Sequence, residues 1–377
     1  MKRSGIYLIS EAACLKPSTG AYQHIRIGFM QLSKTFKVHL FLQNQEISID
    51  KKHIQETFEL NNSIKTNAEK KPLKGLIRDL YLLFKNHKKI FHTLKSYKKI
   101  APEFIYERAS YLNFSGLIIA RLLRIPHYYE ANGLQFEISR KYYESYFNKS
   151  SRLLEKLSYM YSTHSFFVGS YGDFWKIKYN NWSNIENGVE NELIQYFQNH
   201  NKVIEDKVNI CFIARLMAHQ KPELLIDALN QIYDKGQFTL HLIGSGLDSL
   251  EASIHKDIAV VNHGFLNRNE IKKILSVMHV GIIAGSPEFQ SAMKLFDYGC
   301  AKCAVIAPSV HNFKIWFQDS IVFFNKNDSE SLAITIQNLL NESEEILSMG
   351  NRIYRQIALQ HNWEEVFRTI VSKINMN

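Results

Sequence analysis

The sequence predicts an α/β protein with two Rossmann-like domains, each built on a doubly wound parallel sheet. The chain has 377 residues, roughly two to three times the usual size of one domain, so two hydrophobic cores are expected. Short β-rich apolar segments alternate with longer helical patterns along the whole chain, which is typical of parallel sheets covered by helices. With 45% apolar and 22% charged residues, the composition is that of a globular protein.

Five apolar segments in the first half read as strands, and the stretches between them carry apolar residues at helical spacing. The expected strands span residues 5–10, 38–43, 104–108, 126–132 and 164–170. The expected helices include residues 23–36, 114–124 and 152–162. These elements predict a first domain over residues 1–187.

The second half repeats this alternation after a seam between about residues 187 and 208. The expected strands span residues 208–215, 238–244, 258–264, 280–285, 303–308 and 321–325. The expected helices span residues 222–233, 269–278, 293–300 and 329–340. We therefore expect a second domain over residues 188–360, followed by a C-terminal helix in 361–377 that packs back toward the first domain.

The net charge of +10 comes from the first half of the chain. Residues 1–186 contain 29 Lys and Arg against 15 Asp and Glu, whereas residues 187–377 contain 17 against 21. Residues 70–99 hold ten basic residues, one acid and apolar residues at three- and four-residue steps, which predicts an amphipathic helix or helix pair. Such a helix could bind an anionic membrane surface, or pack on its own domain with its lysines in solvent, and both can hold at opposite faces.

The amino-terminal sequence MKRSGIYLISEAACL has an apolar stretch too short for a signal peptide, and no run of about 18 uncharged apolar residues occurs. We therefore expect a cytoplasmic protein, or one on the cytoplasmic face of the inner membrane. Four cysteines fit a reducing compartment. Cys300 and Cys303 have a C-x-x-C spacing, but a structural zinc site needs a second pair, so we expect buried thiols and no metal site.

Two parallel-sheet domains favour a ligand in the cleft between them, at the loops that follow the strands. In this sequence those loops are rich in Gly, Ser, Lys and Arg, the groups that hold phosphorylated ligands. They comprise residues 16–24, 130–133, 169–173, 215–222, 244–248 and 285–294.

Several segments resemble retaining glycosyltransferases of the GT-B fold, specifically the family 4-like (group 1) enzymes of the bacterial surface-polysaccharide type. In the second half the resemblance lies in IARLMAHQKPELLIDAL, HLIGSG, GFLNRNEIKKILSVMHVGI, MKLFDYGCAKCAVIAP and HNWEEVF. In the first half it lies in STGAYQH, YERASYLNFSGLIIARLLRIPHYYEAN and IENGVE. The segments follow the family's order and span nearly the whole chain.

The resemblance implies two domains facing a central cleft, and a hexosyltransferase that retains the anomeric configuration without a metal ion or cofactor. The donor is expected to be a UDP-sugar, with a GDP-sugar as the alternative, and the transferred group a hexose or N-acetylhexosamine. The acceptor is expected to be a saccharide or lipid-linked saccharide of capsule or lipopolysaccharide synthesis, held by the first domain. We expect peripheral membrane contact through residues 70–99 and no nucleic-acid partner.

The resemblance also implies which residues serve the reaction. Without a metal ion, cationic side chains and helix amino termini must stabilise the negative charge that grows on the leaving diphosphate. The expected catalytic residues are Arg215, Lys221, Asn132 and Glu288. The expected donor-binding residues are Gly20, Ser245, Gly246, Lys294, Leu295 and Asp297, of which Asp297 accepts the ribose hydroxyls.

The sequence departs from the family pattern at several positions. The family's two acids are separated by seven residues, but the position eight before Asp297 is Phe289, with Glu288 beside it. The second acid is Asp where the family usually has Glu, and Gln220 stands at the usual lysine position. Asn132 stands where many relatives have a histidine; its side chain can hydrogen-bond a sugar hydroxyl but cannot act as a base near neutral pH.

Three other functions stay open. A GT-B-like UDP-sugar epimerase would share the fold, but the carboxylates and histidines that it requires are missing at matching motifs. A non-catalytic protein could bind nucleic acid through the basic first half, although no helix-turn-helix or aromatic RNA-binding strand motif accompanies the charge. A partner-binding subunit with a vestigial donor site is the third.

Overall fold

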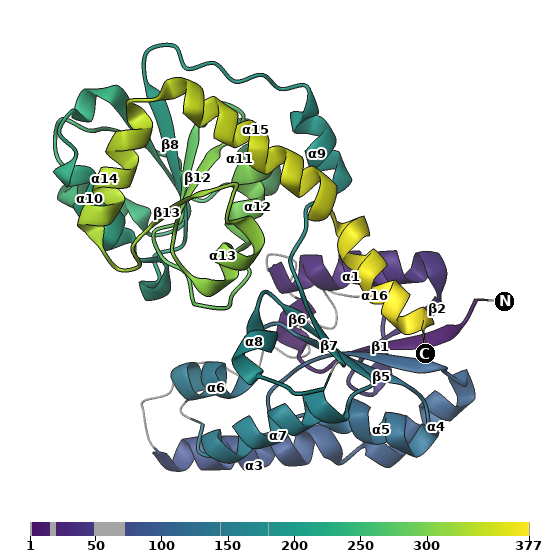
Figure 1. Cartoon of the computed structure of the whole chain (residues 1–377). Helices are drawn as coiled ribbons and strands as arrows, with labels where there is room; N and C mark the ends of the chain where they lie inside the picture. Colours follow the sequence, from purple (N-terminus) through teal and green to yellow (C-terminus); the bar gives the residue numbers. More distant parts are fainter. Residues whose placement is uncertain (1, 16–19, 49–71, 144, 180, 377) are drawn as a thin grey trace. The chain divides into compact units, whose positions relative to one another are not determined.

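The computed structural model describes residues 2–15, 20–48, 72–143, 145–179 and 181–376. They form two compact units (Figure 1). Unit 1 comprises Met1–Ile185 and Phe367–Asn377, and unit 2 comprises Glu186–Val366. Within the described residues, no helix combines the length and the hydrophobicity needed to cross a bilayer. The acceptor and donor roles expected for the two domains, and their boundaries at residues 187 and 360, stay predictions.

Unit 1 is built on a seven-stranded sheet of order β3-β2-β1-β4-β5-β6-β7, in which only the β2–β3 pair is antiparallel. Its strands are β1 (Ser4–Ile9), β2 (Lys37–Leu42), β3 (Gln45–Glu46), β4 (Phe104–Arg108), β5 (His127–Ala131), β6 (His164–Val168) and β7 (Trp182–Ile185). Every residue of β4, β5 and β6 is buried. These strands are therefore covered on both faces, as expected for a parallel sheet.

Helices cover both faces of this sheet. They are α1 (Gly20–Thr35), α3 (Pro72–His87), α4 (Ile90–Ile100), α5 (Ser115–Leu123), α6 (Gln135–Tyr143), α7 (Asn148–Tyr161), α8 (Tyr171–Trp175) and the part of α16 (Trp363–Asn375) from Phe367 on. Gly28 of α1 lets the ring of Phe367 approach closely, because a Cβ there would lie 2.7 Å from the Phe367 Cζ. Arg3 Nη1 then donates to the carbonyl of Ile374 at 3.0 Å, and the side chain of Ile374 is fully buried.

The basic segment over residues 70–99 forms two helices, α3 and α4, as predicted; its first two residues lie outside the described residues. One side of α3 is fixed to the rest of unit 1 by Asp79, which is fully buried. Asp79 Oδ2 accepts hydrogen bonds from Ser145 Oγ and Tyr146 N, both at 2.8 Å, and from Phe147 N at 3.1 Å. Five apolar side chains of α3 and α4 are more than half exposed, namely Ile77, Leu80, Tyr81, Phe84 and Phe91.

Unit 2 is built on a six-stranded parallel sheet of order β10-β9-β8-β11-β12-β13. Its strands are β8 (Val208–Ile213), β9 (Phe238–Ile243), β10 (Ala259–Asn262), β11 (Val280–Ile282), β12 (Ala304–Pro308) and β13 (Val322–Phe324). Its helices are α9 (Asn191–Gln198), α10 (Pro222–Gln231), α11 (Arg268–Leu275), α12 (Met293–Cys300), α13 (His311–Phe317), α14 (Ser329–Leu340) and α15 (Ser343–Gln360).

Local sequence signals explain where several of these helices begin. Asn267 and Glu270 form a capping box at α11, in which each side chain accepts a hydrogen bond from the other residue's backbone N–H. Pro222 is the first residue of α10, where a missing N–H costs nothing. Asp328 caps α14 by accepting from Ser331 N at 2.9 Å.

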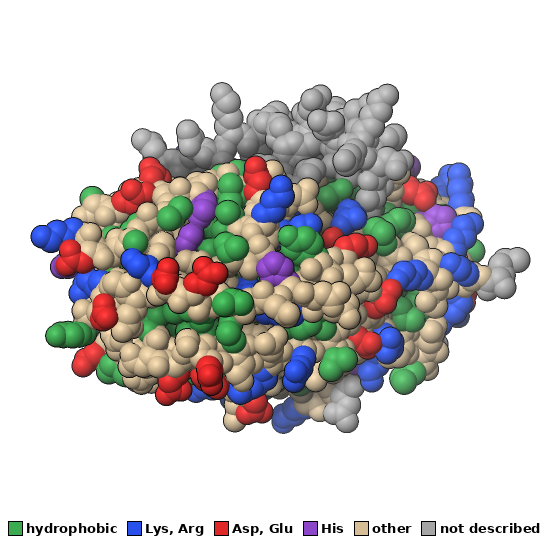
Figure 2. All heavy atoms as spheres, turned by 90° about the horizontal axis from the view of Figure 1, so that it is seen from above, with side chains coloured by type: hydrophobic (Ala, Val, Ile, Leu, Met, Phe, Trp, Pro, Cys, Tyr) green, Lys and Arg blue, Asp and Glu red, His purple; other side chains and the backbone are tan. Residues whose placement is uncertain are grey.

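Every strand expected from the sequence is present, displaced by at most a few residues, and helices α12 and α14 have the predicted bounds. Strands β3 and β7 were not anticipated, because each lies at an edge of the sheet and is polar in sequence. Helix α9 lies in the segment predicted as a seam. Figure 2 shows one face of the molecule, on which basic and acidic side chains are interspersed.

Candidate functional site

The strand order of unit 2 reverses between β8 and β11, because the chain continues from β8 to β9 on one side and returns to β11 on the other. Doubly wound sheets bind ligands at such a switch point, beyond the carboxyl ends of the strands. The loops after β8 and β11 touch here: a Cβ on Gly285 would lie 2.8 Å from Lys221 Cγ, and closer still to the carbonyl oxygen of His219. The two loops therefore form one continuous surface.

Lys294 lies in the first turn of α12, beside this surface. Its Nζ donates a hydrogen bond to Gln220 Oε1 and lies 5.3 Å from the ring centre of Phe212. The side chain is partly buried, and burial lowers the pKa of Lys294 to about 7. Among the described residues its partners are neutral. A partly buried cation with neutral partners at a helix amino terminus is suited to bind an anion.

Asp297 lies three residues further along α12 and lines a cavity of about 160 Å³. Its Oδ1 accepts a hydrogen bond from Arg268 Nη1 at 3.0 Å. Burial raises the pKa of Asp297, and the guanidinium of Arg268 opposes that effect. Glu190, Leu193 and Lys272 also line the cavity. With Glu192 and Arg268 included, the lining carries three carboxylates and two basic side chains beside a partly apolar wall.

The two cations predicted in the loop after β8 differ in their surroundings. Arg215 is exposed and makes no hydrogen bond or ion pair with the described residues. Lys221 precedes α10 with a φ of 50°, and its Nζ donates to Asn327 Oδ1. Both side chains follow the strand that borders the switch point.

The loop after β9 is tied to the loop after β8. Leu216 N donates to the carbonyl of Ser245 at 3.1 Å, and Gly246 has a φ of 81°, which favours glycine. Gly244 is needed for a different reason, since a Cβ there would collide with the carbonyl of Ala214. The predicted Gly-x-Gly turn therefore shapes the neighbouring loop, and its contact with a donor stays a prediction.

The side chain of Glu288 contacts the start of helix α13 and the side chain of Lys326. Its Oε1 accepts from His311 N at the start of α13 at 2.9 Å, and its Oε2 lies 2.6 Å from Lys326 Nζ. Burial raises the pKa of Glu288, but these two contacts outweigh burial and lower it. The neighbouring Phe289 ring lies edge-on to His311. Leu295 is fully buried in the hydrophobic core, so only its backbone could contact a donor.

Unit 1 has its own switch point, between β1 and β4. Gly20 is the first residue of α1, which follows β1, but residues 16–19 of the predicted glycine loop lie outside the described residues. Asn132 directly follows β5, the strand next to β4, and is partly buried. Gly20 thus begins the helix that follows β1, and Asn132 lies in the loop that follows β5.

A buried carboxylate that the sequence analysis did not include among the site residues organises this edge. Glu130, the neighbour of Asn132 at the end of β5, is completely buried. Its Oε1 accepts from Arg108 Nη1 at 2.7 Å and from Asn132 Nδ2 at 2.6 Å. Its Oε2 accepts from His24 Nε2 at 3.0 Å and from the Tyr106 hydroxyl. Burial raises the pKa of Glu130, but these partners outweigh burial and hold it well below its usual range.

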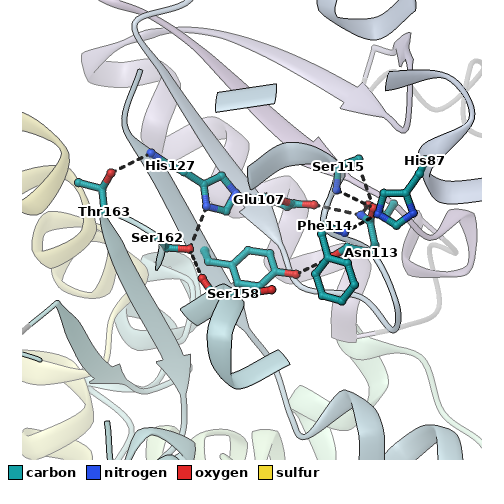
Figure 3. Close-up of polar contacts among 11 residues, drawn as sticks. His87, Glu107, Asn113, Phe114, Ser115, His127, Ser158, Ser162 and Thr163 are labelled. Carbon is teal, nitrogen blue, oxygen red and sulfur yellow. Dashed lines mark hydrogen bonds and ion pairs between the residues drawn. The ribbon is translucent and has the colours of Figure 1, made fainter. Parts of the chain in front are cut away.

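A second buried carboxylate, Glu107, lies on the opposite face of the same sheet. Arg108 pairs in register with Glu130, and Glu107 with the preceding Tyr129, so the two carboxylates point to opposite sides. Figure 3 shows the Glu107 network: Glu107 Oε2 lies 2.8 Å from His127 Nε2, and Oε1 accepts from Asn113 Nδ2 at 3.0 Å. Helix α5 closes over it, since a Cβ at Gly116 would collide with Glu107 Oε2.

The described residues contain no group of three or more His, Cys, Asp or Glu side chains placed to hold a metal ion. Cys300 and Cys303 are free cysteines, and both are buried, as expected. Arg268 was not among the predicted site residues, although the capping pattern at Asn267 and Glu270 marks the start of its helix.

Residues 220–372 match a family model described as "Glycosyl transferase-like". No curated protein matches the sequence. Among solved structures, sucrose-phosphate synthase from Thermosynechococcus elongatus is 13% identical with a TM-score of 0.70, covering 100% of this chain and 99% of that one. HepE from Anabaena, in complex with UDP and glucose, is 14% identical with a TM-score of 0.66, covering 100% of both chains.

The lipopolysaccharide outer core galactosyltransferase WaaB is also similar, with 11% identity and a TM-score of 0.63, covering 98% of this chain and 99% of that one. These likenesses span both units. They confirm the predicted GT-B fold, and the second unit carries most of the glycosyl transferase-like region.

Proposed function

We propose that this protein is a retaining glycosyltransferase that moves a hexose or N-acetylhexosamine from a nucleoside-diphosphate sugar to a saccharide acceptor in polysaccharide or glycolipid synthesis. The match over residues 220–372 and the GT-B fold support this class of enzyme. The observation that carries the proposal is Lys294, a partly buried cation with neutral partners in the first turn of α12. Such a group is stabilised when an anion binds beside it.

In this proposal the donor diphosphate binds at the amino terminus of α12 against Lys294, and Asp297 accepts hydrogen bonds from the ribose hydroxyls. Arg215 and Lys221 add positive charge from the loop after β8. Cations at these positions stabilise the charge that develops as the diphosphate leaves, and they do so without a metal ion. UDP is the favoured nucleotide, because the similar HepE structure contains UDP and glucose; GDP is the alternative.

We further propose that the acceptor is lipid-linked and that α3 and α4 contact the cytoplasmic face of a membrane. The exposed apolar side chains of these helices, Phe84 and Phe91 among them, support this. Lysines accompany them on the same helices. Apolar side chains flanked by lysines combine burial in the headgroup region with attraction to anionic lipids.

Thermal-shift measurements with UDP, GDP and ADP test whether the donor site binds a nucleotide, and they identify the base that it prefers. UDP should stabilise the protein, and Asp297→Ala should remove most of that shift. Sugar transfer should persist in EDTA. Incubation with UDP-N-acetylglucosamine alone separates the epimerase alternative, because only an epimerase makes a new sugar nucleotide without an acceptor. No shift with any nucleotide would contradict the proposal.

A further inference from the structure

The carboxylate of Glu130 has no acceptor capacity left. Each of its two oxygens accepts two hydrogen bonds from described residues, and an ionised carboxylate offers about four lone-pair positions. Side chains from helix α1 and strand β4 supply three of the four donors, and Asn132 supplies the fourth. A fully buried charge is tolerated only when its hydrogen-bonding positions are paired in this way.

Glu130 is ionised in this arrangement, because Arg108 beside it is permanently charged and every partner can donate. An ionised carboxylate only accepts hydrogen bonds. Asn132 must therefore turn its Nδ2 toward Glu130. The reverse orientation would face the Asn132 Oδ1 against a carboxylate oxygen, with repulsion in place of a hydrogen bond. The chemistry of the pair thus fixes the orientation of the amide, which atomic positions alone often leave open.

The other end of the amide is then also fixed. Asn132 Oδ1 accepts no hydrogen bond from the described residues, and the residue is partly buried in the loop that follows β5. Parallel sheets bind ligands at this edge. The site therefore presents a hydrogen-bond acceptor, Asn132 Oδ1, whose orientation is fixed by the bond from Asn132 Nδ2 to Glu130.

We propose that Glu130 is a positioning residue that fixes Asn132 so that its Oδ1 accepts a hydrogen bond from a hydroxyl group of the sugar substrate. This inference rests on the proposed glycosyltransferase function. It specifies the chemistry of recognition: the sugar must carry a hydroxyl that donates at this point. An analogue in which that hydroxyl is replaced by hydrogen or fluorine loses the contact, because neither substituent can donate.

The first test compares sugar nucleotides. UDP-glucose, UDP-galactose, UDP-N-acetylglucosamine and GDP-mannose are screened for turnover, and the monodeoxy and monofluoro analogues of the best donor are then measured. In the wild type, kcat/KM for one deoxy analogue and its fluoro counterpart should fall by about 10- to 100-fold. In Asn132→Ala the same analogues should lose less than threefold relative to the parent donor. Equal losses in both proteins, or no loss in the wild type, would overturn the inference.

The second test measures coupling between the two residues. Glu130→Met removes the acceptors, so its kcat should fall about as far as that of Asn132→Ala, and the double variant should be no slower than either, since the pair acts as a unit. Glu107→Met is the matched control, because it also removes a buried carboxylate but lies on the other face of the sheet. When Glu107→Met is combined with Asn132→Ala, the fold-losses in kcat of the two single variants should multiply.

Multiplicative effects for Glu130→Met would show that Glu130 only supports folding, and would refute positioning. The conservative variant Glu130→Gln should keep kcat within a few-fold. Arg108 can only donate, so the Gln Oε1 must face Arg108 and Asn132 and still hold the amide. If Glu130→Met does not fold, Glu130→Gln and the analogue series still test whether Glu130 positions Asn132. UDP binding should be unchanged in all these variants; absence of UDP binding and turnover in the wild type would instead refute the proposed function.

Discussion

The Nζ atom of Lys294 donates a hydrogen bond to the side-chain oxygen of Gln220. The contact joins the first turn of α12 to the loop after β8, on the two sides of the unit 2 switch point. Because the glutamine side chain is neutral, it orients the ammonium without neutralising it. The charge of Lys294 is therefore available to an incoming anion, and replacing it should affect binding more than folding.

Substitution of this lysine should weaken the donor site specifically. We expect Lys294→Met to weaken UDP binding by at least tenfold and to lower kcat for transfer by about 10²- to 10³-fold, the usual effect of removing one group that stabilises developing negative charge. Isothermal titration calorimetry and initial rates measure the two effects. The control is Lys314→Met, an exposed lysine on α13. Equal UDP affinity in the wild type and Lys294→Met would contradict the assignment.

The affinity for UDP should depend on pH through the same side chain. Burial lowers the pKa of Lys294 to about 7 in the free protein, and a bound diphosphate raises it, since opposite charge favours the protonated form. Binding above pH 7 must therefore take up a proton. The Kd should rise by up to tenfold per pH unit between pH 7 and 9. Lys294→Arg stays charged throughout and should show a flat profile; identical profiles would exclude Lys294 as the group responsible.

Stability should depend on pH through Glu155. Burial raises the pKa of this carboxyl to about 7, although Gln135 N, Phe136 N and the Tyr159 hydroxyl donate to it. A carboxyl with a raised pKa contributes stability that is present below about pH 4.5 and is lost as pH rises through 7.

Glu155→Gln cannot ionise. From pH 5 to pH 8 its unfolding free energy should therefore rise relative to the wild type by up to about 3 kcal/mol. Urea unfolding at several pH values measures the difference. Glu137→Gln replaces an exposed acid of the neighbouring helix α6 and should keep a constant offset from the wild type. A constant offset for Glu155→Gln as well would refute the prediction.

Membrane contact should depend on the apolar side of α3 and α4. Phe84 and Phe91 are 65% and 82% exposed, and burying a phenylalanine in the headgroup region is worth about 1.5–3 kcal/mol. Phe84→Ser and Phe91→Ser should each reduce partitioning into phosphatidylglycerol vesicles by roughly tenfold or more, as measured by co-sedimentation. Tyr233→Ser, at a highly exposed aromatic of unit 2, should have no effect. Equal binding to neutral and anionic vesicles would argue against the electrostatic part.

The sequence predicted most strands well because all pairs except β2–β3 are parallel and the central strands are buried, so those strands are short apolar runs between polar loops. Edge strand β7 was not predicted, because its sequence, WSNI, is half polar and because it pairs with a neighbouring strand on one side only. Helices α12 and α14 were predicted to the residue from their helical sequence patterns, and the structure adds that Asp328 caps α14.

The candidate site was less accessible to prediction. Spacing along the chain could place Lys294 and Asp297 on one helix, but not the partners that define their chemistry. Gln220 is 74 residues from Lys294, and Arg268 is 29 from Asp297. Glu130 was recognisable only as a residue at the end of a strand, since His24 reaches it from 106 residues away. Contacts of this kind depend on tertiary structure, which no local pattern encodes.

The last turns of α16 belong to unit 1, although unit 2 separates them in sequence from the rest of that unit. During synthesis all of unit 2 therefore leaves the ribosome before Phe367 can pack against Gly28 of α1 and before Ile374 can accept a hydrogen bond from Arg3. Unit 2 has its complete core first, whereas the amino-terminal unit must wait for the final residues of the chain. This reverses the usual order in which domains mature on the ribosome, because the amino-terminal unit is completed after the unit that follows it in sequence.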